Sequence, residues 1–370
     1  MLQACSHISI CFAVLSLFCA ACSAQEEKTG GPGKTISAAK PTSRTKASKK
    51  DPSAETEASP GIQLFAPRKM EMQFGMRVNS NQNICSNLLA TMPFPLNWPE
   101  QTVKVINSQI PPNVTWQWRD LPIGAKQSAL ARQLVMKAAI LSPNSQLNLL
   151  IDVEIEKSFI NPPPDTTVFV IPKKVPQKMD MFLQSSPYIE IDLGEIRKVA
   201  KQIAADDPQN AWAQVEKLYD WVRDNMHYKN GKTRQIREAL KDKTGDCEEM
   251  TGIFVALCRA SKIPARCVWI PDHCYPEFYL EDPQGEGHWF PCQVAGERQF
   301  GQMHDYRPIL QKGDKFKVPE DNAPLRYVPR FFTCKQRASG PGVDPSVDEV
   351  MDLGPLKAEM EALRQQNEPK

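Results

Sequence analysis

The stretch that decides the fold is "TGDCEEMTGIFVALCRASKIPAR", residues 244–266. Asp246 is a favourable N-cap residue, and Glu249, three positions later, completes a capping-box pattern. An apolar run follows this pattern and precedes the strand-like run "ARCVWI". The stretch therefore predicts a helix over about 247–261, with Cys247 at its first position.

Cys247 in that position can act as a nucleophile. The unpaired N–H groups and the positive end of a helix stabilise a thiolate and lower the pKa of a cysteine. The same N–H groups can hold an oxyanion. The acidic neighbours Asp246, Glu248 and Glu249 repel a second negative charge. A cationic partner is therefore needed, and histidine is the usual one.

The same stretch, followed by "HCYPEFYL" from His273 and "GHWFPCQ" from Gly287, resembles the transglutaminase-like superfamily. "VEKLYDWVRDNMHY", residues 215–228, is similar to the helix that leads into this domain. The resemblance covers about residues 188–295, and its elements occur in the family's order. It implies a papain-like core, in which helices precede an antiparallel sheet, and acyl transfer by a cysteine.

The resemblance carries three catalytic roles over to this chain. Cys247 matches the nucleophile, and His273 matches the base that activates it. The third position falls on Gln293, where the family normally has Asp. A carboxylate fixes the histidine tautomer and also stabilises the imidazolium, whereas a neutral amide does only the first. Papain-type enzymes use an amide in this role, so an active enzyme and an inactive relative both stay open.

Three other histidines follow the predicted leader. His288 lies on the strand-like run that leads to Gln293 and is the main alternative to His273. His227 lies at a predicted helix end, where a histidine compensates the helix dipole. His304 lies in a polar loop without a motif. His273 is therefore the histidine that we expect beside the nucleophile.

The rest of the chain divides into segments of different pattern. Residues 63–172 contain short alternating apolar runs separated by proline turns, which predicts a β-sandwich-like domain. Residues 188–335 contain helical patterns followed by strand-like runs, which is typical of an α+β domain. Residues 336–370 predict a tail with one short helix. The expected fold class is α+β, a papain-like transglutaminase core preceded by a β-sandwich-like domain.

The N-terminus predicts export. Residues 1–24 contain the apolar run "ISICFAVLSLFCAA" followed by small residues, which is typical of a signal peptide. Cleavage after Ala24 predicts a soluble exported protein, whereas cleavage before Cys22 predicts a lipid anchor, the one expected tether to a membrane. Residues 25–62 predict a disordered linker. The expected location is the periplasm, the cell envelope or the exterior.

Eleven cysteines occur in the chain, four of them in the predicted leader. The others are Cys85, Cys247, Cys258, Cys267, Cys274, Cys292 and Cys334. In an exported protein they can form up to three disulfides, with one thiol left over. Buried free thiols are the alternative. Cys258 lies in an apolar run and is expected in the core, and Cys274, next to His273, is a candidate redox modulator.

Other function classes receive little support. The net charge of +2 gives no electrostatic reason to expect binding to nucleic acid. The cysteines from Cys247 onward lack the close spacing of zinc knuckles, and no glycine motif for nucleotides occurs, so neither a metal nor a cofactor is expected.

The expected function is an exported cysteine enzyme that acts on protein or peptide amide bonds through a thioester. Hydrolysis is favoured over cross-linking, because water is always available. One alternative is a catalytically inactive transglutaminase-like binding or scaffold module. Another is a disulfide-built structural protein in which Cys247 is oxidised.

Overall fold

The computed structural model of the chain describes residues 61–122, 129–206, 210–338 and 343–367. The predicted signal peptide, including Cys22, and nearly all of the predicted linker lie outside the described residues. No helix in the described part of the chain is long and apolar enough to cross a membrane.

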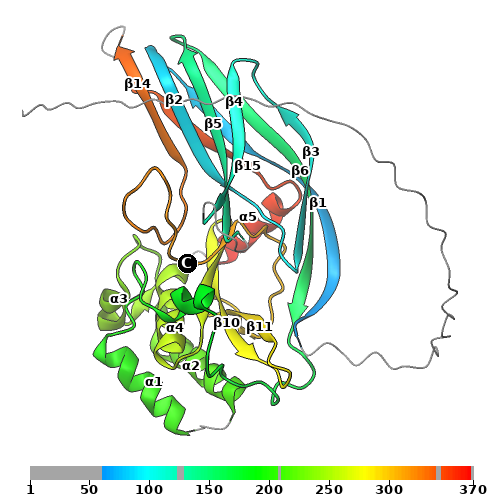
Figure 1. The fold of residues 1–370 in the computed structure, drawn as a ribbon, viewed down its shortest axis with the longest axis vertical. Helices are drawn as coiled ribbons and strands as arrows, with labels where there is room; N and C mark the ends of the chain where they lie inside the picture. The colour runs from blue at the N-terminus through cyan, green and yellow to red at the C-terminus, as the bar shows by residue number, and fades with distance from the viewer. Residues whose placement is uncertain (1–60, 123–128, 207–209, 339–342, 368–370) are drawn as a thin grey trace, which may run out of the picture. The chain divides into compact units, whose positions relative to one another are not determined.

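The first sheet is antiparallel and has the strand order β15-β1-β6-β3 (Figure 1). Its strands are β1 (Gln63–Asn79), β3 (Gln101–Gln109), β6 (Gln146–Asn161) and β15 (Ser346–Asp352). Alternate side chains of β6, such as Leu149, Ile151 and Val153, are fully buried, because successive side chains of a strand point to opposite faces. These inward side chains form one half of the core of the sandwich.

The second sheet continues from the N-terminal strands into the strands that follow the helices. Its order is β12-β11-β10-β9-β13-β5-β2-β14, and β4 also pairs with β5. The strands are β2 (Asn83–Phe94), β4 (Val114–Leu121), β5 (Ala131–Leu141), β9 (Ala265–Ile270), β10 (His273–Glu281), β11 (Gly287–Gln293), β12 (Gln299–Phe300), β13 (Gln311–Lys312) and β14 (Phe331–Ala338). The short strand β13 makes the connection, because Gln311 pairs with Trp269 of β9 and with Ala131 of β5.

The helices pack together around α4 and against the strand β10 (Figure 1). They are the 3-10 helix η1 (Gln177–Leu183) and the helices α1 (Gly194–Asp206), α2 (Ala211–Asn225), α3 (Ile236–Asp242) and α4 (Cys247–Ala260), with the two-residue strands β7 (His227–Tyr228) and β8 (Thr244–Gly245) between them. The residues of α4 from Glu249 to Arg259 are buried, as expected for a helix that is apolar on most sides. The order of strands, helices and antiparallel strands confirms the predicted α+β class.

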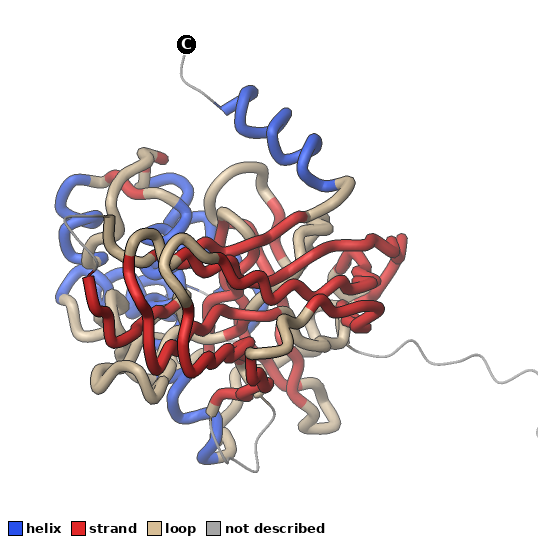
Figure 2. The backbone as a smooth tube through the Cα atoms, turned by 90° about the horizontal axis from the view of Figure 1, so that it is seen from above, coloured by secondary structure: helices blue, strands red, loops and turns tan. Residues whose placement is uncertain are grey.

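The C-terminal residues take part in the sandwich. Residues 336–370 look like a tail in the sequence, yet they contain the end of β14, β15 and the helix α5 (Leu356–Asn367). β14 pairs with β2 and β15 pairs with β1, so the two strands satisfy backbone groups that an open sheet edge would leave unpaired. α5 lies apart from the other helices (Figure 2), and its Leu356 and Met360 are buried in the sandwich core.

A buried ion network joins the sandwich strands to β10. The Lys312 ammonium lies 2.6 Å from the Glu100 carboxylate and 2.6 Å from the Glu277 carboxylate, and all three side chains are almost fully buried. Removing one partner of such a network leaves an uncompensated buried charge, which is strongly destabilising. The network therefore fixes β10, the strand that begins with His273, relative to the sandwich.

Candidate active site

Cys247 and His273 line the same cavity, which has a volume of about 990 Å³. The first turn of α4 and the start of β10 form one wall of this cavity. Other parts of the cavity are lined by Tyr228 of β7, Trp269 of β9, Arg326 and Glu349 of β15, among other residues. The predicted nucleophile is therefore half-buried but borders open space.

The capping box predicted at the start of α4 is confirmed. The Asp246 carboxylate accepts hydrogen bonds from the amides of Glu248, at 2.8 Å, and of Glu249. The Glu249 carboxylate in turn accepts the Asp246 amide at 2.9 Å. A Cβ atom on Gly245 would lie 2.7 Å from Glu249 Cβ, so this cap requires glycine there. The amide of Cys247 is the first-turn donor that the cap does not use.

The sulfur of Cys247 has two neighbouring donors. The pKa of Cys247 is lowered to about 4, first by a hydrogen bond from the Cys274 thiol and then by the hydrogen bond and the positive charge of His273, while burial opposes the shift. Cys247 is consequently a thiolate at neutral pH, the form in which a cysteine reacts as a nucleophile.

Gln293 lies next to His273, as its position in the motif predicted. Nε2 of His273 is 2.8 Å from Oε1 of Gln293, which joins the first residue of β10 to the last residue of β11. This contact leaves Nδ1 of the ring for Cys247. The structure therefore brings Cys247, His273 and Gln293 together in a row. The amide can hold the ring in place but supplies no charge to an imidazolium.

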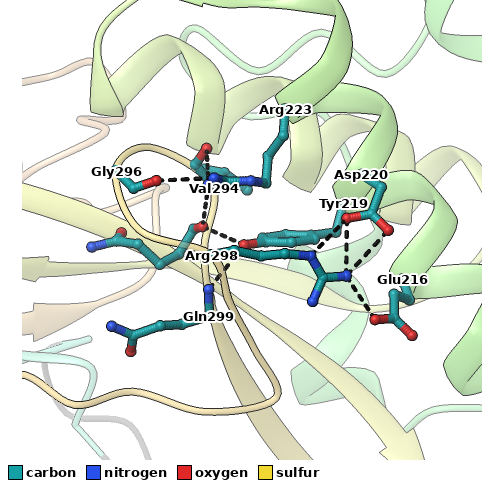
Figure 3. Close-up of polar contacts among 9 residues, drawn as sticks. Glu216, Tyr219, Asp220, Arg223, Val294, Gly296, Arg298 and Gln299 are labelled. Carbon is teal, nitrogen blue, oxygen red and sulfur yellow. Dashed lines mark hydrogen bonds and ion pairs between the residues drawn. The ribbon is translucent and has the colours of Figure 1, made fainter.

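Two residues of α2 hold the backbone of Gln293. The Tyr219 hydroxyl donates to the Gln293 carbonyl at 2.7 Å. The Arg223 guanidinium donates to the carbonyls of Gln293 and Val294, both at 3.2 Å, and of Gly296 at 3.0 Å. Figure 3 shows Arg223 directed at Val294 and Gly296. Both residues belong to the stretch 215–228 that resembles the lead-in helix of the family, where they lie one helical turn apart, but the sequence pattern assigned a role to neither.

Asp246 and Glu248, beside Cys247, both have raised pKa values. Burial raises the pKa of Asp246 to about 7, although the amide of Glu248 opposes this shift, and the charge of Cys247 adds to it. Burial also raises the pKa of Glu248, against the opposite effect of Arg326. Arg326 is 5% exposed, donates to the Glu248 carbonyl, and lies 3.4 Å from its carboxylate. The sequence did not single out Arg326, because it is distant along the chain and belongs to no motif.

The competing histidines have other partners. Nε2 of His288 is 2.8 Å from the Asp282 carboxylate, and the ring packs near Phe169. Nε2 of His304 is 3.0 Å from the Asn161 side chain. His227 is exposed on β7. Among the described histidines, His273 is the one that lines the cavity.

The described cysteines are all free thiols, so the expected disulfides are not shown. Cys258 is fully buried in the helical core, as predicted. The thiol of Cys274 also contacts the Cys247 carbonyl oxygen at 3.5 Å. A second thiol contact joins Cys85 of β2 to Cys334 of β14. No group of metal-ligating side chains occurs among the residues that the structure describes.

Residues 197–294 match the family model described as the transglutaminase-like superfamily, and this range includes Cys247, His273 and Gln293. The chain carries a transglutaminase-like domain. The matched range runs from α1 to the end of β11 and leaves out the sandwich. No curated protein matches the chain.

Two solved structures that resemble the chain are named as proteases. "A Putative Cysteine Protease from Cytophaga hutchinsonii" is 15% identical with a TM-score of 0.46, over 77% of this chain and 93% of that one. "A putative protease from Parabacteroides distasonis" is 11% identical with a TM-score of 0.25, over 59% of this chain and 47% of that one.

Proposed function

We propose that the protein is a cysteine acyl-transfer enzyme that acts on amide bonds of peptides or proteins and hydrolyses them. The observation that carries the proposal is the position of Cys247. It is the first residue of α4, it borders the cavity, and its sulfur is hydrogen-bonded to His273. A thiolate at a helix N-terminus beside a histidine is an activated nucleophile for acyl chemistry.

The mechanism follows from the positions of these groups. The Cys247 thiolate attacks the carbonyl carbon of the substrate amide. The unused Cys247 amide and the positive end of α4 stabilise the resulting oxyanion. The protonated His273 ring gives its proton to the leaving amine, and Gln293 keeps the ring aligned. Neutral His273 then takes a proton from water, which attacks the thioester and releases the acid product.

Water is the acceptor that we favour, because the cavity is open and water is always present. A primary amine in the place of water would give cross-linking by the same thioester. We also propose that the protein acts outside the cytoplasm, on the strength of its signal-like N-terminus.

Trapping of the thioester tests the proposal. The full chain is incubated with a random-sequence peptide library, quenched in acid, and mapped by mass spectrometry. We expect acyl adducts on Cys247 and cleaved or deamidated peptides in solution, and neither with the Cys247→Ala variant. A primary amine added in excess reports on cross-linking, because it appears in the products only if it competes with water.

A catalytically inactive binding module is the second candidate, and the contact between His273 and the neutral Gln293 favours it. In that case Cys247 is alkylated rapidly, yet the peptide library leaves no adduct and no product. Peptides retained by the folded chain without covalent attachment would support this candidate against the enzyme.

A further inference from the structure

The nucleophile has a second thiol beside it that the proposed acyl transfer does not use. Cys274 follows His273 on β10, and its sulfur donates to the sulfur of Cys247 and contacts the Cys247 carbonyl oxygen at 3.5 Å. Cys274 is 1% exposed, whereas Cys247 is half-buried and borders the cavity. A small molecule in the cavity therefore reaches Cys247 first, and Cys274 lies directly behind it.

This arrangement meets the requirements of a reversible oxidation site. The oxidant must meet an accessible thiolate, and a second thiol must stand within reach to capture the oxidised sulfur. Cys247 supplies the thiolate, since the pKa of Cys247 is lowered by Cys274 and His273. Cys274 supplies the second thiol, and it is the one whose sulfur contacts that of Cys247.

A second thiol pair among the described residues offers a comparison. Cys85 and Cys334 are also in hydrogen-bond contact across β2 and β14. Burial, and then the contact with Cys334, raise the pKa of Cys85 to about 12, so Cys85 keeps its proton at neutral pH. The two pairs therefore share proximity, but the pKa of Cys247 is lowered whereas that of Cys85 is raised.

We propose that Cys247 and Cys274 form a peroxide-sensitive dithiol, in which a hydroperoxide oxidises Cys247 and Cys274 then closes a reversible disulfide over the nucleophile. The disulfide blocks the proposed acyl transfer, so its regulatory meaning rests on the proposed function. The oxidation itself needs no substrate.

The chemistry balances with the hydroperoxide as the oxidant. The Cys247 thiolate attacks one peroxide oxygen, the O–O bond breaks, and hydroxide or an alkoxide leaves. This step oxidises the sulfur by two electrons to a sulfenic acid. The sulfur of Cys274 then attacks the sulfur of Cys247, the S–O bond breaks, and the proton of Cys274 leaves with the hydroxyl group as water.

The first step also makes Cys274 easier to deprotonate. Burial raises the pKa of Cys274, and so does the hydrogen bond and negative charge of Cys247, whereas Arg326 has the opposite effect. A sulfenic acid at Cys247 carries no such charge. Oxidation of Cys247 thus prepares its neighbour for the second step.

Peptide mapping of the peroxide-treated full chain tests the proposal. Fully reduced protein is exposed to a small excess of hydrogen peroxide at pH 7, blocked with N-ethylmaleimide, and digested without reduction. We expect a linked peptide that joins Cys247 to Cys274 and disappears with dithiothreitol. The Cys85–Cys334 pair is the internal control, and its linked peptide should form at least about tenfold more slowly.

The Cys274→Ser variant separates capture from simple oxidation. Serine keeps a donor beside Cys247 but cannot form a disulfide. Dimedone should label a Cys247 sulfenic acid in this variant, and longer exposure should give sulfinic and sulfonic acids. Recovery of alkylatable Cys247 after dithiothreitol should then fall by about tenfold relative to the wild type. Circular dichroism spectra of the two proteins check that the variant is folded.

Three results would overturn the proposal. In the wild type, Cys247 could proceed to sulfinic acid without a linked peptide, or link to another molecule instead of Cys274. The Cys85–Cys334 peptide could also form as fast as the Cys247–Cys274 peptide, which would make proximity the deciding factor. None of these results depends on whether the peptide library is cleaved, so the proposed function can fail or stand separately.

Discussion

Two histidine pairs lie on the same hairpin and differ in one chemical respect. His273 contacts the neutral amide of Gln293 at 2.8 Å, and His288 contacts the carboxylate of Asp282 at the same distance. Of these four residues, His273 is the one that lines the cavity. The transglutaminase-like domain thus has a histidine–carboxylate pair of the kind that a catalytic triad uses, but away from the nucleophile.

Contact with Cys247 therefore identifies the catalytic histidine, whereas the presence of a carboxylate beside a histidine does not. Asp282 is engaged with its own loop, because its carboxylate also accepts the amides of Gln284 and Glu286, both at 2.9 Å. The contact between His288 and Asp282 therefore stabilises the turn between β10 and β11. The His273 pair is aligned from behind by α2.

Replacement of His273 should have the largest effect on the nucleophile. His273→Ala removes a donor and a positive charge from Cys247, so a smaller fraction of the sulfur is thiolate at low pH. We expect alkylation of Cys247 by iodoacetamide at pH 6 to slow by roughly tenfold to 100-fold. Peptide mapping identifies the labelled cysteine.

His288→Ala is the matched control for this measurement. It removes the other paired histidine of the hairpin, and the alkylation rate of Cys247 should stay within about twofold of the wild type. If alkylation of Cys247 slowed equally in the two variants, contact with the sulfur would not be the cause. A general disturbance of the fold would then explain both losses.

Replacement of the Gln293 amide by a carboxylate should have an intermediate effect on the site. Gln293→Glu places a negative charge beside Nε2 of His273, and an opposite charge within hydrogen-bond distance favours the protonated ring. The ring should stay protonated to a pH roughly one to two units higher than in the wild type. NMR titration of the ring protons measures this shift. A titration that does not move would show that the new carboxylate does not reach the ring, in contrast to the contact that Gln293 makes.

Replacement of Asp282 should have the smallest effect on the site but a clear effect on stability. Asp282→Ala removes three hydrogen bonds from a side chain that is 2% exposed, so the free energy of unfolding should fall by about 1–3 kcal/mol. Alkylation of Cys247 should be unchanged. Thermal unfolding of both proteins measures the difference.

The pH dependence of that difference has a definite sign. Burial tends to raise the pKa of Asp282, but the hydrogen bond from His288 and those from the two amides outweigh it, so the pKa is lowered overall. A lowered carboxyl pKa contributes stability above the unfolded value, about 3.9, and this contribution is lost as the pH falls through the folded value. The difference in free energy of unfolding between the wild type and Asp282→Ala should therefore be largest near pH 6 and should shrink below about pH 4. A difference that widens in acid would contradict the lowered pKa of Asp282.

Much of the fold near the nucleophile could be predicted because its signals are local. The helix start at Cys247 depends on Asp246 and Glu249, which are three residues apart, and the structure has the capping box that this spacing predicts. The α+β class followed from the order of periodic patterns. The C-terminal strands escaped prediction, since "SVDEVMD" is too polar and too short to be read without its partner β1.

The sequence by itself determined the α+β class, the start of α4 and the position of Cys247 on it, because caps and periodicity act between neighbouring residues. Only the tertiary structure decided what surrounds the sulfur. The thiol of Cys274 reaches Cys247 through the packing of β10 on α4, and Arg326 reaches Glu248 from a segment far along the chain. Such contacts depend on strand register and on the packing of distant segments. No local pattern of residues encodes them.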